Sequence, residues 1–297
     1  MQKTTIHLAF FSVLFSVAFR FSVAVAGEEI QATEPKAYYG AQFYASILHQ
    51  DHDEKLKVAI KNILKSGHVK VAGKPDQLAA KCDSIKNCSV QTSLGYNGAR
   101  KFIFGTFYLV KVDSSNYGIK EMYCDRIYQG ADFGQSGKPG PGIVPDNTVI
   151  NVEHTWPQSR FTNRYAKELQ KADLHHLFPT DSQMNSLRGN HIFGEVERDR
   201  QNAKCSASRF GEGSAGSAPI FEPPDRHKGH VARALFYFSI RYDIAISPAE
   251  EVILKRWDKQ FPVDTEEVTR NEEIFKLQNN RNPFIDHPEL TESISDF

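Results

Sequence analysis

The sequence lacks a net charge, a CxxC pair, an internal repeat and a low-complexity segment. Because 36 basic residues balance 36 acidic ones, a polyanion would have to be held by a local basic patch and not by the field of the whole protein. Without a CxxC pair, a metal–thiolate site is disfavoured. What remains is an ordinary globular composition, in which 40% hydrophobic residues can bury a sizeable core in one large domain or two smaller ones.

A long apolar run is also missing, and the longest candidate stands at the N-terminus. There "MQK" precedes the 12 residues "LAFFSVLFSVAF", and "AVA" ends at Ala26. A short apolar centre between a positive start and small residues predicts a signal peptide over residues 1–26. A membrane span needs about 20 apolar residues, and Arg20 follows the run directly, so a retained anchor in a membrane is disfavoured.

The mature chain is expected to begin near Gly27 and to be secreted or periplasmic. Loss of Lys3 and Arg20 with the signal peptide leaves 34 basic and 36 acidic residues, a formal net charge of −2. This charge neither requires nor excludes a nucleic-acid substrate.

Four cysteines, an even number, fit two disulfides in an oxidising compartment. They are Cys82, Cys88, Cys124 and Cys205, and three pairings are possible. The short loop from Cys82 to Cys88 favours a bond between these two, which leaves Cys124 for Cys205. We hypothesise that disulfide formation outside the cytosol delays activity until export; full activity of the reduced protein would contradict this.

The first half of the chain is predicted to be mostly helical. An N-terminal helix is expected over residues 27–50, followed by an amphipathic helix in "EKLKVAIKNILKSG", residues 54–67, which Gly67 ends. Residues 93–111 combine a short helix with an apolar run, and residues 130–147 form a Gly/Pro-rich loop. The buried stripe of the amphipathic helix is expected to consist of Leu56, Ile60, Ile63 and Leu64.

The second half alternates strands and helices. "TVINV" (148–152) is β-branched and predicts a strand, and "DLHHLF" (173–178) a second one. A helix is expected from Asp181 to Arg188, with Thr180 and Gln183 as a capping box and Gly189 just past its end. "HVARALFYFSIRYDI" (230–244) is apolar nearly all round, which indicates a buried helix. A helical C-terminal part then ends in a proline-bearing tail, so the fold class is a mixed, helix-rich α+β.

Polar residues that suit phosphodiester chemistry accompany these predicted elements. They are Glu153 and His154 at the first strand, Asp173, His175 and His176 in the second, and Asn185 in the helix. A carboxylate and an amide oxygen suit a hard cation such as Mg²⁺ and leave positions for water and phosphate. A neutral histidine is a suitable base for the attacking water. The pattern favours phosphodiester hydrolysis.

Strand geometry sets a condition on this site. Successive residues of a regular strand point to opposite faces, so we expect the strand to end, twist or bulge if Glu153 and His154 serve one phosphate. Trp156 followed by Pro157 favours such an irregular exit. The same alternation disfavours a zinc hydrolase built on His154 and the adjacent pair at 175 and 176.

An arginine is expected to steady the phosphate charge. Arg188 is the first candidate, because it shares a helix face with Asn185 and Asp181 at spacings of three and four. Arg160 is the second candidate. For either arginine, pairing with a carboxylate of the protein is the structural alternative.

Several separated segments occur in order over roughly residues 95–290. They are "YNGARKFIFG", "MYCDRIY", "NVEHTWPQSRF", "DLHHLFPTDSQMNSLRGN", "KGHVARALFYFSIRY" and "NRNPFIDHPE". Together they resemble the bacterial endonuclease I family of secreted and periplasmic nucleases. The resemblance implies a ββα-metal, or His-Me, finger core within one domain over residues 27–297, of which residues 27–94 are the less diagnostic part.

The resemblance also implies roles for three residues. His154 would be the general base, and Glu153 and Asn185 the ligands of one Mg²⁺ or a similar divalent cation such as Mn²⁺ or Ca²⁺. The nine-residue step from His176 to Asn185 is similar to that of other ββα-metal nucleases and favours Asn185 over Asn190. The expected activity is sequence-nonspecific endonucleolytic hydrolysis of DNA and/or RNA by a monomer, leaving 5′-phosphate and 3′-hydroxyl ends.

The sequence does not separate DNA from RNA, because contacts to backbone phosphates carry no base information. Two other functions stay open: hydrolysis of small phosphodiesters, and a noncatalytic secreted module that binds nucleic acid. The second is disfavoured because Glu153, His154 and Asn185 are all present.

Overall fold

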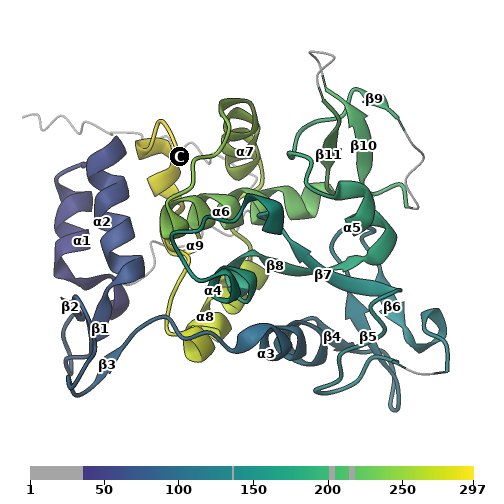
Figure 1. The fold of residues 1–297 in the computed structure, drawn as a ribbon, viewed down its shortest axis with the longest axis horizontal. Coiled ribbons are helices and arrows are strands. Elements are labelled where there is room, and N and C mark those ends of the chain that lie inside the picture. Colours follow the sequence, from purple (N-terminus) through teal and green to yellow (C-terminus); the bar gives the residue numbers. More distant parts are fainter. Residues whose placement is uncertain (1–35, 136, 201–204, 214–217) are drawn as a thin grey trace, which may run out of the picture. The chain divides into compact units, whose positions relative to one another are not determined.

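The structure is a computed structural model that describes residues 36–135, 137–200, 205–213 and 218–297 (Figure 1). The expected signal peptide and the start of the expected N-terminal helix lie outside these residues. From Pro35 to Phe297 the chain groups into one unit. Within the described ranges, no helix combines the length and apolar character that a membrane crossing requires.

Helices and short strands alternate along the chain (Figure 1). The helices are α1 (Gly40–Leu48), α2 (Asp53–Lys65), α3 (Gly95–Phe102), α4 (Lys167–Lys171), α5 (Ser182–Arg188), α6 (Asp225–Tyr242), α7 (Pro248–Gln260), α8 (Thr265–Gln278) and α9 (Pro283–Asp286). Short 3-10 or π turns cover Ala37–Tyr39, Ile103–Phe107, Gly130–Asp132, Gln158–Arg160, Leu174–His176 and Pro288–Ser293.

The strands form small antiparallel sheets. The strands are β1 (Gly67–Val69), β2 (Gln77–Ala79), β3 (Cys88–Ser89), β4 (Leu109–Lys111), β5 (Tyr117–Lys120), β6 (Ile127–Gln129), β7 (Ile150–His154), β8 (Leu177–Asp181), β9 (Arg198–Asp199), β10 (Arg209–Glu212) and β11 (Ile220–Glu222). Their orders are β2-β1-β3, β4-β5-β6, β7-β8 and β11-β10-β9.

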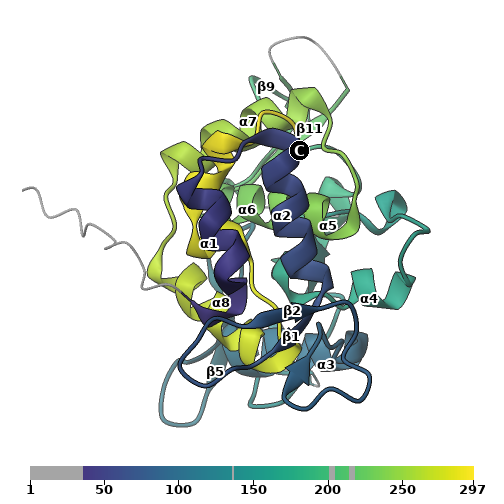
Figure 2. The ribbon, with the colours of Figure 1, turned by 90° about the vertical axis from the view of Figure 1, so that its left-hand side faces the viewer.

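Helix α6 is the centre of the hydrophobic core. Every residue from His227 to Tyr242 is buried, which confirms the buried helix predicted from its apolar surface. It packs against α2, α7 and α9, and Figure 2 shows α1 and α2 in front of it. Burying one Leu or Phe side chain contributes about 1.5–3 kcal/mol, so Leu235, Phe236 and Phe238 anchor the surrounding layers.

Helix α2 and the first disulfide also agree with the sequence. The predicted stripe of α2 is buried, with Leu56, Ile60, Ile63 and Leu64 between 0% and 2% exposed. The helix ends at Lys65, just before Gly67. The three-stranded sheet of β1, β2 and β3 was not predicted. The Cys82–Cys88 disulfide joins the segment that follows β2 to the first residue of β3.

The second disulfide joins Cys124 to Cys205, so both predicted pairings are confirmed. It ties the segment after β5 to the segment before β10. The Ser208 hydroxyl supports the same junction by donating to the Tyr123 carbonyl at 2.7 Å.

Two predicted element boundaries and one predicted helix cap need correction. "DLHHLF" is not one strand, because Leu174–His176 form a 3-10 turn and β8 begins at Leu177. The strand predicted at 148–152 runs from Ile150 to His154. Helix α5 is capped by Asp181, whose carboxylate accepts the N–H groups of Gln183 at 3.0 Å and Met184 at 2.9 Å, and not by a box of Thr180 and Gln183.

Buried neutral histidines make the folded state sensitive to acid. Burial lowers the pKa of His175 and His176 to about 4 and that of His227 well below its usual value. An unfolded histidine binds a proton below about pH 6.5, so the unfolded state binds more protons than the native state in this range. Each such group can remove up to about 1.4 kcal/mol of stability per pH unit as the pH falls from 6.5 toward 4.

We therefore expect the midpoint of thermal unfolding to fall steadily between pH 7 and pH 5. His227, which has no hydrogen-bond partner at either ring nitrogen among the described residues, is the clearest test. His227→Phe should make the profile flatter than that of the unmodified chain, while His49→Gln at an exposed position should leave it unchanged. Equal profiles for all three proteins, measured by calorimetry, would contradict the assignment.

Candidate active site

Strands β7 and β8 and helix α5 form the frame of the candidate site. The strands pair antiparallel from Ile150 opposite Asp181 to His154 opposite Leu177. Two side chains of α5, three residues apart, donate hydrogen bonds to β7 and hold the helix along the strand. Asn185 Nδ2 donates to the Val152 carbonyl at 3.2 Å, and Arg188 Nη1 to the His154 carbonyl at 3.0 Å.

The strand ends at His154 and an irregular exit with a 3-10 turn at Gln158–Arg160 follows, as Trp156 and Pro157 favoured, but no twist or bulge separates Glu153 from His154. Both residues continue the regular register with β8, and even Thr155 N–H donates to the His176 carbonyl at 3.0 Å. Strand alternation therefore sends the two side chains to opposite faces of β7. Glu153 faces Arg188 of α5, and His154 faces the side of α3 and α4.

The Glu153 face is closed and charge-compensated. Glu153 is 1% exposed, and its Oε1 lies 2.7 Å from Arg188 Nη1. Burial raises the pKa of Glu153, and the Arg188 charge and the Tyr123 hydroxyl oppose that rise. On the same face, Asn185 Nδ2 also donates to Asn151 Oδ1 at 2.7 Å. The structure thus brings Glu153 and Asn185 to the same side of β7.

The His154 face fixes one tautomer of the imidazole. Its Nε2 lies 3.1 Å from the Lys171 carbonyl oxygen, which can only accept, so the proton of the neutral ring belongs on Nε2. The unprotonated Nδ1 lies 3.5 Å from Gln158 Nε2. Burial, followed by the charge of His176, lowers the pKa of His154 to about 3. His154 is therefore neutral at neutral pH, and its Nδ1 is an acceptor whose one contact among the described residues is the long one from Gln158.

Asp173 fixes the turn that supplies this carbonyl. Its buried carboxylate accepts five hydrogen bonds, from Gln91, Tyr237, Tyr242, Gln278 and the His175 backbone. Burial raises the pKa of Asp173, but the neighbouring histidines and these donors bring it below its usual value. The sequence pointed to Asp173 as a site residue, and its contacts make it a support of the turn between α4 and β8.

The histidines proposed for zinc do not converge. His175 Nε2 faces the Asn280 carbonyl at 3.3 Å, and His176 Nε2 faces the Gln170 carbonyl at 2.8 Å. Each imidazole is thus engaged by a different backbone carbonyl. The adjacent pair diverges, but strand alternation is not the reason, because both residues lie in a 3-10 turn and not in a strand.

The two arginines expected at the phosphate are both engaged by the protein. The Arg188 side chain is 1% exposed and also donates to the Thr155 carbonyl at 2.7 Å. The Arg160 side chain is 33% exposed, pairs with Glu250 at 3.3 Å and donates to the Asn190 carbonyl at 2.6 Å. Arg160 therefore keeps the more accessible guanidinium.

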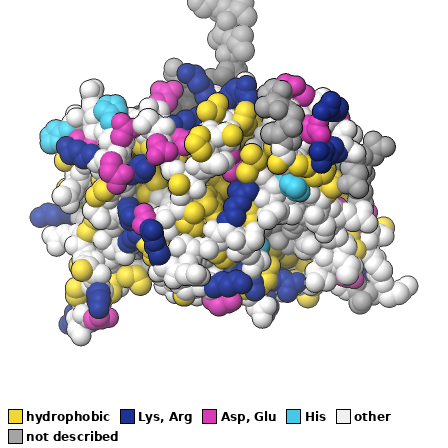
Figure 3. Space-filling model, turned by 45° about the horizontal axis from the view of Figure 1, so that its top comes forward, with side chains coloured by type: hydrophobic (Ala, Val, Ile, Leu, Met, Phe, Trp, Pro, Cys, Tyr) yellow, Lys and Arg dark blue, Asp and Glu magenta, His cyan; other side chains and the backbone are white. Residues whose placement is uncertain are grey.

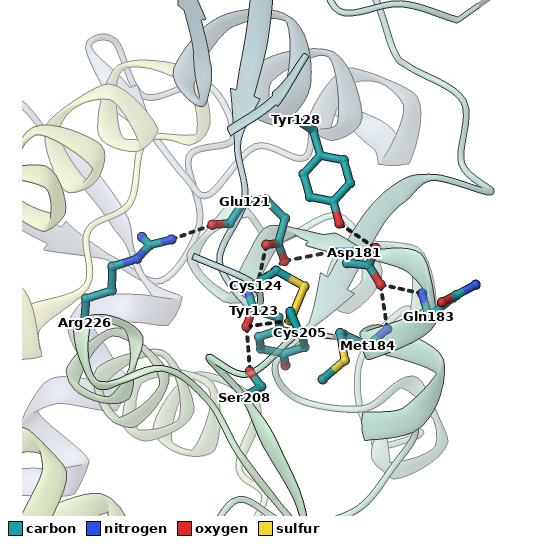
Figure 4. The surroundings of a disulfide bond; sticks show 10 residues. All are labelled: Glu121, Tyr123, Cys124, Tyr128, Asp181, Gln183, Met184, Cys205, Ser208 and Arg226. Carbon is teal, nitrogen blue, oxygen red and sulfur yellow. Dashed lines mark hydrogen bonds between the residues drawn. A yellow bond between two sulfur atoms is a disulfide. The ribbon is translucent and has the colours of Figure 1, made fainter. Parts of the chain in front are cut away.

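Glu121, which the sequence did not single out, positions the start of α5 (Figure 4). Its carboxylate is fully buried and accepts three backbone N–H groups. These come from Tyr123 at 2.6 Å, Cys124 at 2.6 Å and Asp181 at 2.8 Å. One side chain thus ties the Cys124–Cys205 disulfide to the capping residue of the helix that carries Asn185.

The oxygen donors on the Glu153 face fit a hard cation in type. Asn185 Nδ2 donates to two acceptors, Asn151 Oδ1 and the Val152 carbonyl. Within the described ranges Asn185 Oδ1 accepts no hydrogen bond. Oδ1 is therefore the atom of this side chain that could bind a cation. Glu153 Oε1 also accepts no hydrogen bond there, although the Arg188 charge lies beside it. A carboxylate with an amide oxygen is a donor set that Mg²⁺ takes.

A second group of ligand-type atoms lies elsewhere, at His230, Asp264 and Glu267. His230 Nε2 is 3.0 Å from Asp264 Oδ2. Arg233 already engages both oxygens of Glu267, with Nε at 2.9 Å from Oε1 and Nη2 at 2.5 Å from Oε2. Both Glu267 oxygens thus accept hydrogen bonds, unlike Glu153 Oε1, and Asp264 is about half exposed, so the group is an ion-pair network at the edge of the core.

Comparison with known proteins places these residues in a family. The family model for endonuclease I matches residues 76–289. An extracellular ribonuclease of Bacillus subtilis is 38% identical over 162 residues, 48% of this chain and 53% of that protein. An extracellular deoxyribonuclease of Aeromonas hydrophila is 33% identical over 118 residues, 39% of this chain and 49% of that protein. The chain spans about half the length of these curated relatives. Since the family match covers most of the sequence, the chain belongs to the endonuclease I family.

Proposed function

We propose that this protein is a secreted or periplasmic endonuclease that hydrolyses phosphodiester bonds of DNA and/or RNA without sequence specificity. The observation that carries the proposal is the fixed tautomer of His154, in which the Lys171 carbonyl holds Nε2–H and Nδ1 is left as an acceptor with only a 3.5 Å contact from Gln158. Relatives named as extracellular ribonuclease and extracellular deoxyribonuclease support both substrate classes. The proposed core is a ββα-metal finger made of β7, β8 and α5.

In the proposed reaction, His154 Nδ1 takes a proton from the water that attacks phosphorus in line. The resulting imidazolium keeps its Nε2 hydrogen bond to the Lys171 carbonyl, which stabilises the added charge. The P–O3′ bond breaks as the new P–O bond forms, and the departing 3′ oxygen takes a proton from solvent water, which leaves a 3′-hydroxyl end and a 5′-phosphate end. Because Asp173 holds the turn after Lys171, the base is oriented before substrate arrives.

Glu153 and Asn185 would hold one divalent cation, Mg²⁺ or a similar ion. When bound, such an ion supplies positive charge to a non-bridging phosphate oxygen and to the departing oxygen. Among the described residues β7 pairs with β8 along one edge only, and α5 lies along the other. Because Asn185 and Arg188 already contact the carbonyls on that edge, the phosphate is proposed to reach both faces at the end of the strand, beyond His154.

The arginines take different roles in this proposal. Arg160 is the more exposed of the two arginines. In this proposal it releases the Glu250 carboxylate, which lies 3.3 Å away, and contacts the substrate phosphate instead. Arg188 is buried against two carbonyls and Glu153. We assign it to positioning the strand end and not to direct phosphate contact.

Replacing the proposed base tests the reaction directly. A general base contributes about 10²–10⁴-fold, so His154→Ala should lower kcat on plasmid DNA and on long RNA by a factor in that range. Internal cleavage and the chemistry of the new ends would be followed on gels and by end labelling. His49→Gln serves as the exposed control. Near-full activity of the His154→Ala protein, or cleavage confined to small phosphodiesters, would contradict the proposal.

Replacing a proposed ligand should change the metal requirement. Asn185→Ala is expected to need a higher Mg²⁺ concentration for half-maximal cleavage, because one oxygen donor is lost. The control is Asn190→Ala, an exposed asparagine five residues along the chain. Cleavage that persists in excess chelator, or an equal Mg²⁺ requirement in both variants, would contradict the metal assignment.

A further inference from the structure

Beside His154 lies a group of side chains that the proposed reaction does not use. The Tyr96 ring, on α3, stacks at 5.5 Å and 29° from the His154 ring. Lys171, the last residue of α4, places its Nζ 4.5 Å from the centre of the Tyr96 ring. Arg100, one turn further along α3, has its guanidinium carbon 6.0 Å from the same centre. All three side chains are partly exposed.

The two cations of this group have no carboxylate partner among the described residues. Elsewhere basic side chains are commonly paired, as Arg160 is with Glu250 and Arg164 with Asp243. On the face shown in Figure 3, basic and acidic side chains also lie next to each other at several places. Helix α3 contains no acidic residue, and Glu168 of α4 is exposed and forms no ion pair with Lys171. The surface beside His154 therefore carries uncompensated positive charge on a chain of zero net charge.

A purely structural reading of these contacts is weaker. A cation over an aromatic ring at an exposed site contributes about 0.5–1 kcal/mol, and it positions the cation without neutralising it. An ammonium held in this way stays able to bind an anion. Lys171 also provides the carbonyl that orients His154, and its ammonium is placed beside the proposed base by the Tyr96 ring.

We propose that Tyr96, Arg100 and Lys171 form a binding site for the backbone phosphates of a nucleic acid, next to the phosphate that is cleaved. We call these three residues the α3–α4 cradle. The proposal rests on the proposed function and adds a substrate site to it. The ligand is the polyanionic backbone and not the bases, since Lys and Arg contacts to phosphate carry no sequence information. The Tyr96 ring contacts both the His154 ring and the Lys171 ammonium, and in this proposal it positions the two side chains relative to each other.

Salt dependence of binding tests the cradle. Binding of a labelled DNA duplex and of a single strand would be measured by fluorescence anisotropy over a range of KCl concentrations, in the His154→Ala protein, which should bind without cutting. Each phosphate contact contributes about 0.9 to the slope of log K against log salt for duplex DNA and about 0.7 for a single strand. Lys171→Gln and Arg100→Gln should each lower the slope by about that amount and weaken binding several-fold at low salt.

The controls separate charge from structure. Lys171→Arg keeps the charge and should restore the slope, while Lys74→Gln removes an exposed, unpaired cation outside the cradle and should change nothing. Tyr96→Leu should weaken binding less than loss of either cation does. Thermal unfolding of each variant checks that the fold is kept.

Two results would overturn the cradle without touching the proposed function. One is an unchanged slope in Lys171→Gln and Arg100→Gln while the unmodified chain still cuts plasmid. The other is a loss of kcat in Lys171→Gln that is equal on a dinucleotide and on long DNA, which would assign Lys171 only to orienting His154. If the unmodified chain neither binds nor cuts nucleic acid, the proposed function itself fails.

Discussion

The candidate site depends on the buried ion pair between the Arg188 guanidinium and the Glu153 carboxylate. The guanidinium donates to the carbonyls of His154 and Thr155 and lies 2.7 Å from Glu153 Oε1. Breaking a buried ion pair by removing one partner typically costs about 3–5 kcal/mol, because the other charge is left uncompensated. Arg188 therefore offsets the cost of burying the Glu153 carboxylate, whose pKa burial raises. One side chain of α5 thus fixes the end of β7, the carboxylate and the position of its own helix.

The strand divides the site into two halves with separate supports. The carboxylate half is held by Arg188 and, through Asp181, by Glu121. The imidazole half is held by the Lys171 carbonyl in a turn that Asp173 fixes. In the proposed function, a phosphate would reach both halves at the end of β7, beyond His154. The regular register of β7 would then set the separation between the proposed base and the proposed oxygen donors.

Local patterns in the sequence predicted the parts that depend on near neighbours. The stripe of α2, the buried α6 and the closure of Cys82 with Cys88 follow from spacing alone. The supports could not be predicted, because they depend on distant partners: Asp173 is held by Gln91 and Gln278, and Glu121 by Asp181. Strand alternation required β7 to end, twist or bulge if Glu153 and His154 served one phosphate. The strand ends at His154 but stays regular through both residues, because its long-range pairing with β8 continues to that point.

Burial of His154 has a consequence for when it can act as a base. Burial lowers the pKa of His154 to about 3, and a base this weak is far from the value near the working pH that favours proton transfer. A phosphate placed beside the ring adds negative charge, which favours the imidazolium and raises that pKa. The uncompensated cations at Lys171 and Arg100 would hold such a phosphate next to the ring. The Lys171 charge itself lowers the pKa of His154, so the bound phosphate, and not the cations that hold it, would raise that pKa when substrate is present.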